Sequence, residues 1–303
     1  MLDSKALKKS LEQSAANRAA MTRRLGMVPL SILRLSRGSL SRRMFQYAGD
    51  GDTSVKVHNT NTAKRKRLAA ISYKGAKASP SNSQSGGGGP VLSIMPAELV
   101  EFFIRYYAEP GDVYLDPFMG QGVQLQVAVL LGLHYYGYDL SEGFCEYIDS
   151  IIERLEIKST IVQATHGDSR SPDEIPDGIG DFSFHSPPYW DTEDYGDDPR
   201  QLGTGKTYRE FLDGMHDVAA AWLPKFKPGA WHIVNVNDFR KGGKFIPYHA
   251  DLISTFCAAG WELHDTWIID GLVGGLPRAF AVSSNNRRLA PKVHEYALVF
   301  VKP

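Results

Sequence analysis

The sequence predicts an α/β protein whose core is a mostly parallel sheet. An apolar strand at residues 113–116 leads through a glycine-bearing turn into a helix at residues 123–131, and a second strand at residues 135–139 ends in an acid. Such a strand–helix–strand unit is typical of parallel sheets that bind nucleotides. Two more apolar stretches, residues 161–164 and 181–185, read as the third and fourth strands. This alternation of strands and helices favours parallel pairing.

Length and composition allow one sizeable core with an appendage. The chain has 303 residues, of which 43% are apolar and 22% are charged, as in ordinary globular proteins. Two cysteines, Cys145 and Cys257, are too few for a disulfide framework or a cysteine-rich zinc site. No apolar run approaches roughly 18 residues, so we expect no membrane span. The N-terminus lacks the apolar core of a secretory signal.

The neutral net charge conceals a strong asymmetry along the chain. Residues 1–90 contain 17 Lys and Arg against 4 Asp and Glu, whereas residues 91–303 contain 17 against 30. This split predicts a basic arm that binds a polyanion, although a basic tail kept for solubility would have the same composition. The cations that we expect to contact phosphates are Arg34, Arg37, Arg42, Arg43, Lys64, Arg65, Lys66 and Arg67.

A Ser- and Gly-rich stretch at residues 79–90 marks the expected domain boundary. Its composition is that of a flexible linker or mobile loop, and its four-glycine run could also serve as the hinge of a lid. We therefore expect a basic N-terminal region at residues 1–78 and a folded domain at residues 91–303. Five acids between Asp191 and Asp198 have no His or Cys among them, so we expect a solvated loop there and no metal site.

The turn after the first strand distinguishes two classes of nucleotide ligand. From Asp116 to Gly122 it reads Asp-Pro-Phe-Met-Gly-Gln-Gly, and a dinucleotide site would want a third glycine where Leu125 stands. A carboxylate at Asp116 would repel a pyrophosphate, but it suits a cationic ligand that carries an amino-acid group. Asp139, at the end of the second strand, is placed to accept hydrogen bonds from ribose hydroxyls. The combination favours S-adenosylmethionine over NAD.

The ends of the third and fourth strands carry further candidate groups. Asp168 could accept a hydrogen bond from the adenine amino group of the same cofactor, or it could cap a turn. The fourth strand ends in Ser-Pro-Pro-Tyr at residues 186–189. Prolines stop the strand and leave its last carbonyls free, because they have no N–H and a fixed φ. Free carbonyls, a hydroxyl and an aromatic face suit a flat group that bears an amine.

The order of these features resembles the amino-methyltransferases of DNA, which modify the exocyclic amine of cytosine (N4) or adenine (N6). The resemblance covers roughly residues 91–303 and rests on Pro96, the glycine turn, Asp139, Asp168 and the Ser-Pro-Pro-Tyr motif. It implies a Rossmann-like class I S-adenosylmethionine-dependent methyltransferase fold. Such a fold is a mostly parallel seven-stranded sheet with helices on both faces, here with a basic N-terminal extension. The whole looks most like phage or prophage DNA methylases.

The resemblance also implies roles for individual residues. Ser186 Oγ and the Pro187 carbonyl would accept the two N–H bonds of the target amine, while Tyr189 stacks on a base that has left the helix. No metal and no covalent intermediate is required, because positioning dominates. The implied catalytic residues are Ser186, Pro187, Pro188 and Tyr189. The implied S-adenosylmethionine contacts are Asp116, Pro117, Phe118, Gly120, Gly122, Asp139 and Asp168.

The target base and the class of substrate stay open at this point. The family more often uses Ser with cytosine and Asp with adenine, which favours N4 of cytosine over N6 of adenine. Carbon-5 methylation needs a thiolate usually presented after a proline, and both cysteines fall in predicted helices. The same fold could also serve an enzyme that methylates RNA, or a DNA-binding protein that is catalytically silent.

Recognition of a target sequence has to come from outside these motifs. The chain has no insertion of about 100 residues, the size of a small module, that would serve as a target-recognition domain. We expect the long loop at residues 271–294, with Arg287 and Arg288, to face DNA, although a plain surface excursion would look similar. A protein that acts on bacterial DNA is expected in the cytoplasm or nucleoid.

Overall fold

The computed structural model describes residues 32–34, 95–154, 160–192, 198–203, 205–270 and 294–303. The predicted linker at residues 79–90 and the loop at residues 271–293 lie outside these ranges. So do most of the cations predicted to contact DNA: Arg37, Arg42, Arg43, Lys64, Arg65, Lys66, Arg67, Arg287 and Arg288. The domain boundaries proposed from composition therefore remain predictions.

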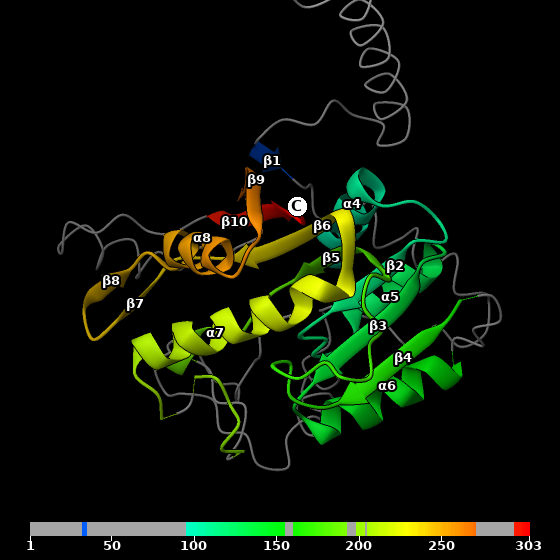
Figure 1. Cartoon of the computed structure of the whole chain (residues 1–303), viewed down its shortest axis with the longest axis horizontal. Helices are drawn as coiled ribbons and strands as arrows, with labels where there is room; N and C mark the ends of the chain where they lie inside the picture. The colour runs from blue at the N-terminus through cyan, green and yellow to red at the C-terminus, as the bar shows by residue number, and fades with distance from the viewer. Residues whose placement is uncertain (1–31, 35–94, 155–159, 193–197, 204, 271–293) are drawn as a thin grey trace, which may run out of the picture.

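The core is an eight-stranded sheet with the strand order β1-β9-β10-β6-β5-β2-β3-β4 (Figure 1). Five neighbouring strands run parallel: β4 (Val162–His166), β3 (His134–Asp139), β2 (Val113–Asp116), β5 (Gly180–His185) and β6 (Phe226–Val236). β10 (His294–Val301) lies antiparallel between β6 and β9 (Glu262–Asp270). These seven strands form the mostly parallel sheet that the sequence predicts.

The eighth strand comes from the segment predicted to be an arm. β1 (Ile32–Arg34) pairs in parallel with β9, opposite Ile268–Asp270, and so extends the edge of the main sheet. This short part of the basic N-terminal region therefore belongs to the main sheet.

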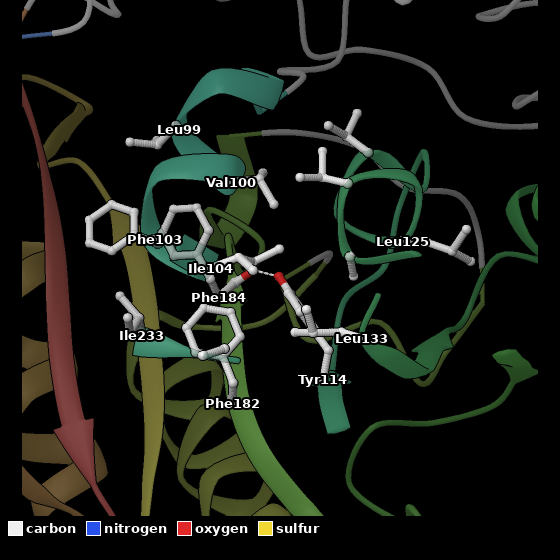
Figure 2. Close-up of a cluster of buried hydrophobic side chains, with 14 of the residues drawn as sticks. Leu99, Val100, Phe103, Ile104, Tyr114, Leu125, Leu133, Phe182, Phe184 and Ile233 are labelled. Atoms are coloured by element: carbon white, nitrogen blue, oxygen red, sulfur yellow. Dashed lines mark hydrogen bonds between the residues drawn. The ribbon is translucent and has the colours of Figure 1, made fainter. Parts of the chain in front are cut away.

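In the described part of the chain, five α-helices cover the two faces of this sheet. α4 (Ala97–Tyr107), α5 (Val123–Leu130) and α6 (Glu142–Arg154) pack on one face, while α7 (Tyr208–Trp222) and α8 (Tyr248–Ala258) pack on the other (Figure 1). Strand residues alternate between the two faces because side chains alternate along a strand. Phe182 and Phe184 of β5 thus meet α4, as Figure 2 shows, whereas His185 points to the opposite face.

Two local features were not predicted from the sequence. β6 begins at Phe226, so that the Lys-Pro-Gly stretch at residues 227–229 lies inside the strand. Pro228 is tolerated because it is exposed, at a place where the pairing with β5 shifts register. A separate hairpin of β7 (Phe239–Lys241) and β8 (Lys244–Ile246) was not predicted.

Candidate functional site

One pocket gathers most of the residues predicted to act in catalysis or to bind S-adenosylmethionine. It lies where β2, β3 and β5 end at their carboxyl edges, which is where open parallel sheets bind ligands. Among the residues predicted to act, its lining includes Phe118, Gly120, Asp139, Asp168, Ser186, Pro187, Pro188 and Tyr189. Asp116, Pro117 and Gly122 are buried next to it without lining it.

The glycine turn shapes one wall of the pocket. Gly120 has a φ of +47° with open space where a side chain would project, so its backbone faces the cavity directly. Gly122, the N-cap residue before α5, has a φ of +70°, and a Cβ there would lie 3.0 Å from Ile148 Cγ1 of α6. Only glycine meets both the backbone conformation and the close packing at this second position.

Asp139 connects this turn to the end of β3. One carboxylate oxygen accepts the Gly120 N–H at 2.9 Å and the other accepts the Ser141 N–H at 2.9 Å. Burial raises the pKa of Asp139 to about 6, because desolvation outweighs these two hydrogen bonds. Each oxygen keeps a second lone pair. The carboxylate is therefore held rigidly at the pocket wall and can still accept hydrogen bonds from a ligand.

Asp116 lies beneath the turn and not on its surface. Its side chain is fully buried; Oδ1 accepts the Phe118 N–H at 3.1 Å and Oδ2 accepts the Tyr135 hydroxyl at 2.7 Å. Burial raises the pKa of Asp116 to about 7, and the two hydrogen bonds only partly offset that effect. In this structure Asp116 positions the turn that carries Phe118.

Asp168, after β4, forms the opposite rim together with a short surface segment. The Arg170 guanidinium pairs with its carboxylate at 2.6 Å and also donates to the Arg200 carbonyl at 3.1 Å. Partial burial raises the pKa of Asp168, but the hydrogen bonds from Arg170 outweigh burial and lower it overall. Asp168 is thus ionised and fixed, and Arg170 ties it to the wall formed by Arg200, Gln201 and Leu202.

The Ser-Pro-Pro-Tyr motif is held from behind by α8 and the end of β6. The Tyr248 hydroxyl donates to the Pro188 carbonyl at 2.9 Å, and the Asn237 N–H donates to the Tyr189 hydroxyl at 2.8 Å. Between the described residues, no hydrogen bond uses the Ser186 hydroxyl or the Pro187 carbonyl. These two acceptors therefore stay available at the pocket.

Two buried histidines lie on the strands next to the motif: His185 ends β5, just before Ser186, and His232 belongs to the neighbouring strand β6. The Nε2 atoms of His185 and His232 approach to 2.8 Å, and both side chains are fully buried. Burial lowers the pKa of His185 to about 3. The pKa of His232 is also lowered, mainly by burial and to a smaller extent by the neighbouring His185. Both rings are thus neutral, one donating and the other accepting. Sequence reasoning missed this pair because its members lie on different strands.

The pocket also contains residues that the motifs did not single out. Met95 precedes α4, Gln124 lies in the first turn of α5 and Phe144 belongs to α6. Phe144 could have been found, because it follows the acid at the end of β3 by five positions at the start of an amphipathic helix. Arg200 to Leu202 carried no recognisable signal.

The described residues offer neither a metal cluster nor a membrane-spanning helix. Among them, no group of three or more His, Cys, Asp or Glu side chains is arranged to hold a metal ion. The described helices include none with both the length and the apolar character needed to cross a membrane.

Known proteins share parts of this sequence. A family model described as DNA methylase matches residues 44–150, about a third of the chain. The type II methyltransferase M1.MboII of Moraxella bovis is 36% identical over 66 residues, which are 22% of this chain and 25% of that protein. The type II methyltransferase M.MthZI of Methanothermobacter thermautotrophicus is 38% identical over 68 residues, 22% of this chain and 19% of that protein. The chain thus spans a quarter or less of the length of these relatives.

A solved structure shares the fold at low sequence identity. The structure of geranyl diphosphate methyltransferase in complex with GPP and sinefungin superposes with a TM-score of 0.50 and 13% identity, covering 87% of this chain and 99% of that one. A likeness of this kind concerns the fold alone. The protein therefore has the Rossmann-like class I methyltransferase fold, and its sequence bears out the predicted resemblance to the DNA amino-methyltransferases.

Proposed function

We propose that the protein is an S-adenosylmethionine-dependent DNA methyltransferase that acts on the exocyclic amine of a base extruded from the helix. The observation that carries the proposal is the joining, in one pocket, of a glycine turn with two fixed acids and a Ser-Pro-Pro-Tyr loop with free acceptors. A nucleoside-type cofactor fits the first half and a planar amine fits the second.

The cofactor half of the pocket suits S-adenosylmethionine chemically. Gly120 leaves its backbone open to the cavity, Asp139 offers lone pairs for ribose hydroxyls, and Phe118 and Phe144 supply aromatic faces. Asp168 is an ionised acceptor at the rim, suited to an amino group. When bound, this cofactor supplies an electrophilic methyl group on a sulfonium. Asp116 supports the same half indirectly, through the Phe118 N–H.

The amine half of the pocket provides positioning. An exocyclic amine is a poor nucleophile, because its lone pair is delocalised into the ring. Acceptance of its two N–H bonds by Ser186 Oγ and the Pro187 carbonyl would favour tetrahedral geometry at nitrogen and direct the lone pair away from the ring. Tyr248 occupies the Pro188 carbonyl, which leaves Pro187 as the backbone acceptor of the motif. Catalysis of this kind depends on geometry and needs no charged intermediate on the protein.

The base would be held by the aromatic residues at the end of the motif. The Tyr189 ring lines the pocket and is fixed through its hydroxyl and through ring contacts with Phe239 and Tyr248 at 6.1 and 5.6 Å. A fixed ring can stack on an extruded base without losing side-chain freedom, which helps to offset the few kcal/mol of unstacking. N4 of cytosine is the favoured target because the motif begins with Ser, and N6 of adenine is the alternative.

DNA is the proposed substrate and the proposed partner. The family model and the matched relatives are DNA methylases and type II methyltransferases by name. The basic composition of residues 1–90 supports binding to a polyanion, and β1 (Ile32–Arg34), a short part of that region, pairs with the edge of the main sheet. If the protein methylates DNA in this way, we expect it to act in a bacterial cytoplasm, on the DNA of the host or of a phage.

A transfer assay distinguishes this function from RNA methylation and from silent binding. Protein and tritiated S-adenosylmethionine would be incubated with duplex DNA, single-stranded DNA and RNA of matched sequence. The proposal predicts label in DNA and little in RNA. Label mainly in RNA would show that RNA, and not DNA, is the substrate. Measured binding of the cofactor without label in any of the three nucleic acids would favour a catalytically silent binding protein.

A further inference from the structure

The β7–β8 hairpin is a basic projection on a body of acidic composition. From Phe239 to Ile246 it reads Phe-Arg-Lys-Gly-Gly-Lys-Phe-Ile, with three cations and no acid, whereas residues 91–303 carry 17 cations against 30 acids. Its turn glycines have φ values of +57° and +80°, the positive pair required by the tightest hairpins. Figure 1 shows the hairpin extending past α8, apart from the main sheet.

The base of this hairpin is fixed to the loop that would hold the target base. Two residues before β7, the Asn237 N–H holds the Tyr189 hydroxyl, and the first residue of β7, Phe239, packs on the Tyr189 ring. On the same strand Lys241 Nζ pairs with Asp191 Oδ2 at 2.7 Å and lies 5.9 Å from the centre of the Trp190 ring. The hairpin is thus continuous with the candidate site.

The outer part of the hairpin carries positive charge that its own contacts do not neutralise, although Arg240 also donates a hydrogen bond to the Gly243 carbonyl of the turn at 3.5 Å. Lys241 lies directly opposite Lys244, and like charges in this position repel. Asp191 compensates Lys241, but within the described residues Lys244 has no carboxylate partner. Arg240 lies opposite Phe245, with its guanidinium 5.3 Å from the ring centre, and Phe245 is 40% exposed. Among the described residues neither Arg240 nor Lys244 is paired with a carboxylate, and this uncompensated positive charge points to an anionic ligand.

We propose that this hairpin is a DNA-binding element that grips the duplex next to the extruded base. Arg240 and Lys244 contact backbone phosphates, and Phe245 makes apolar contact with sugar or base edges. A two-stranded ribbon is narrow enough to enter the major groove of B-DNA. Its cations are complementary to phosphate, while the rest of the domain is acidic in composition. This inference rests on the proposed function, because it takes duplex DNA as the substrate.

A pair of double variants with the same change of charge tests the proposal. R240A/K244A removes two cations from the hairpin, and R105A/K227A removes one from the last turn of α4 and one from the start of β6, at the edge of the sheet away from the pocket. Binding to a fluorescein-labelled duplex would be followed by anisotropy at several salt concentrations. Two lost phosphate contacts should reduce the slope of log K against log salt by about 1.8. The control double variant should keep the slope of the wild type.

Two additional variants define what the cations and the ring contribute. R240K/K244R keeps both charges and should keep the salt slope. F245A should weaken duplex binding severalfold without a change in salt slope, because it removes only apolar contact. Unchanged S-adenosylmethionine affinity and circular dichroism would show that each variant keeps its fold.

The outcomes separate this inference from the proposed function. If the wild type methylates and binds DNA but R240A/K244A behaves like R105A/K227A, the hairpin proposal is overturned and the function stands. If R240A/K244A alone loses salt slope and raises the DNA KM about tenfold, the proposal is supported. If the wild type neither binds nor methylates DNA, the proposed function fails and the hairpin proposal fails with it.

Discussion

The backbone N–H of Asn237 donates a hydrogen bond to the hydroxyl of Tyr189 at 2.8 Å. This contact joins the end of β6 to the Ser-Pro-Pro-Tyr motif after β5, so two neighbouring strands fix the tyrosine ring at the pocket. The ring can be tested separately from the hydroxyl.

We expect Tyr189→Ala to lower kcat/KM for DNA methylation by about 5- to 150-fold, since base–aromatic stacking contributes about 1–3 kcal/mol. Tyr189→Phe keeps the ring and loses the hydroxyl that accepts the Asn237 N–H, which should reduce the free energy of unfolding by about 1 kcal/mol and activity by less than about tenfold. Steady-state kinetics on duplex DNA would check both values. Equal losses in the two variants would argue against a stacking role.

The buried pair His185–His232 predicts acid sensitivity of a definite sign. Both folded-state pKa values are lowered, so an unfolded chain binds more protons than the native one as pH falls below about 6.5. The pair's contribution to stability is present above that pH and is lost progressively toward pH 3, by up to about 1.4 kcal/mol per pH unit for each histidine.

The control for this prediction is the double variant H185M/H232M. Asp116 and Asp139 have raised pKa values and act in the opposite direction, and they are common to both proteins. Urea unfolding at about pH 7.5, about pH 6 and about pH 5, which spans the upper part of the window set by the histidines, should show the wild type losing stability relative to the variant. Parallel pH profiles would contradict a neutral histidine pair.

Asp116 and Asp139 should differ in their effect on the cofactor. Asp139 lines the pocket, whereas Asp116 lies beneath it and bonds to Phe118 and Tyr135. We expect Asp139→Asn to weaken S-adenosylmethionine binding more than Asp116→Asn, as measured by isothermal titration. The Asp116 pKa of about 7 lies above that of an unfolded chain, so its stabilising contribution is full below about pH 4 and is lost as pH rises through 7. A larger loss of affinity in Asp116→Asn would mean that this carboxylate contacts the cofactor directly.

Gly122 offers a test of packing beneath the glycine turn. Gly122→Ala introduces a Cβ at φ +70° and at 3.0 Å from Ile148, whereas Gly178→Ala introduces one at φ +69° with nothing within 4 Å. The strained backbone should cost about 1–2 kcal/mol in both, and the contact with α6 should add to the loss only at Gly122. Thermal unfolding of the two variants compares them directly. Equal shifts in Tm would show that α6 adjusts without loss.

The parallel strands and the residues at their ends could be predicted from the sequence, because each strand end carries a distinctive residue. Asp116, Asp139 and the Ser-Pro-Pro-Tyr motif each follow a short apolar run, and parallel strands bring their carboxyl ends to one edge. The direction of a side chain at that edge could not be predicted in the same way. The side chain of Asp116 is buried, like those of Tyr114 and Leu115 before it. Its burial depends on the hydrogen bond from the Tyr135 hydroxyl of the neighbouring strand, which the local sequence does not reveal.

The remaining differences have similar physical causes. The β7–β8 hairpin was missed because its strands are three residues long and rich in cations, so neither alternates apolar with polar side chains. The His185–His232 contact joins residues 47 positions apart. The residues that pair between β1 and β9 are even farther apart in the sequence, and no local pattern predicts their pairing.

Mass spectrometry of nucleosides tests the central claim most directly. Duplex DNA from a methylation-free host would be incubated with protein and S-adenosylmethionine, then digested and analysed. The account predicts N4-methylcytosine, or N6-methyladenine as the alternative, with at least about a hundredfold less product from Ser186→Ala, as for the loss of a group that acts on the transition state. Neither methylated base in the wild-type sample, from protein shown to bind the cofactor, would contradict it.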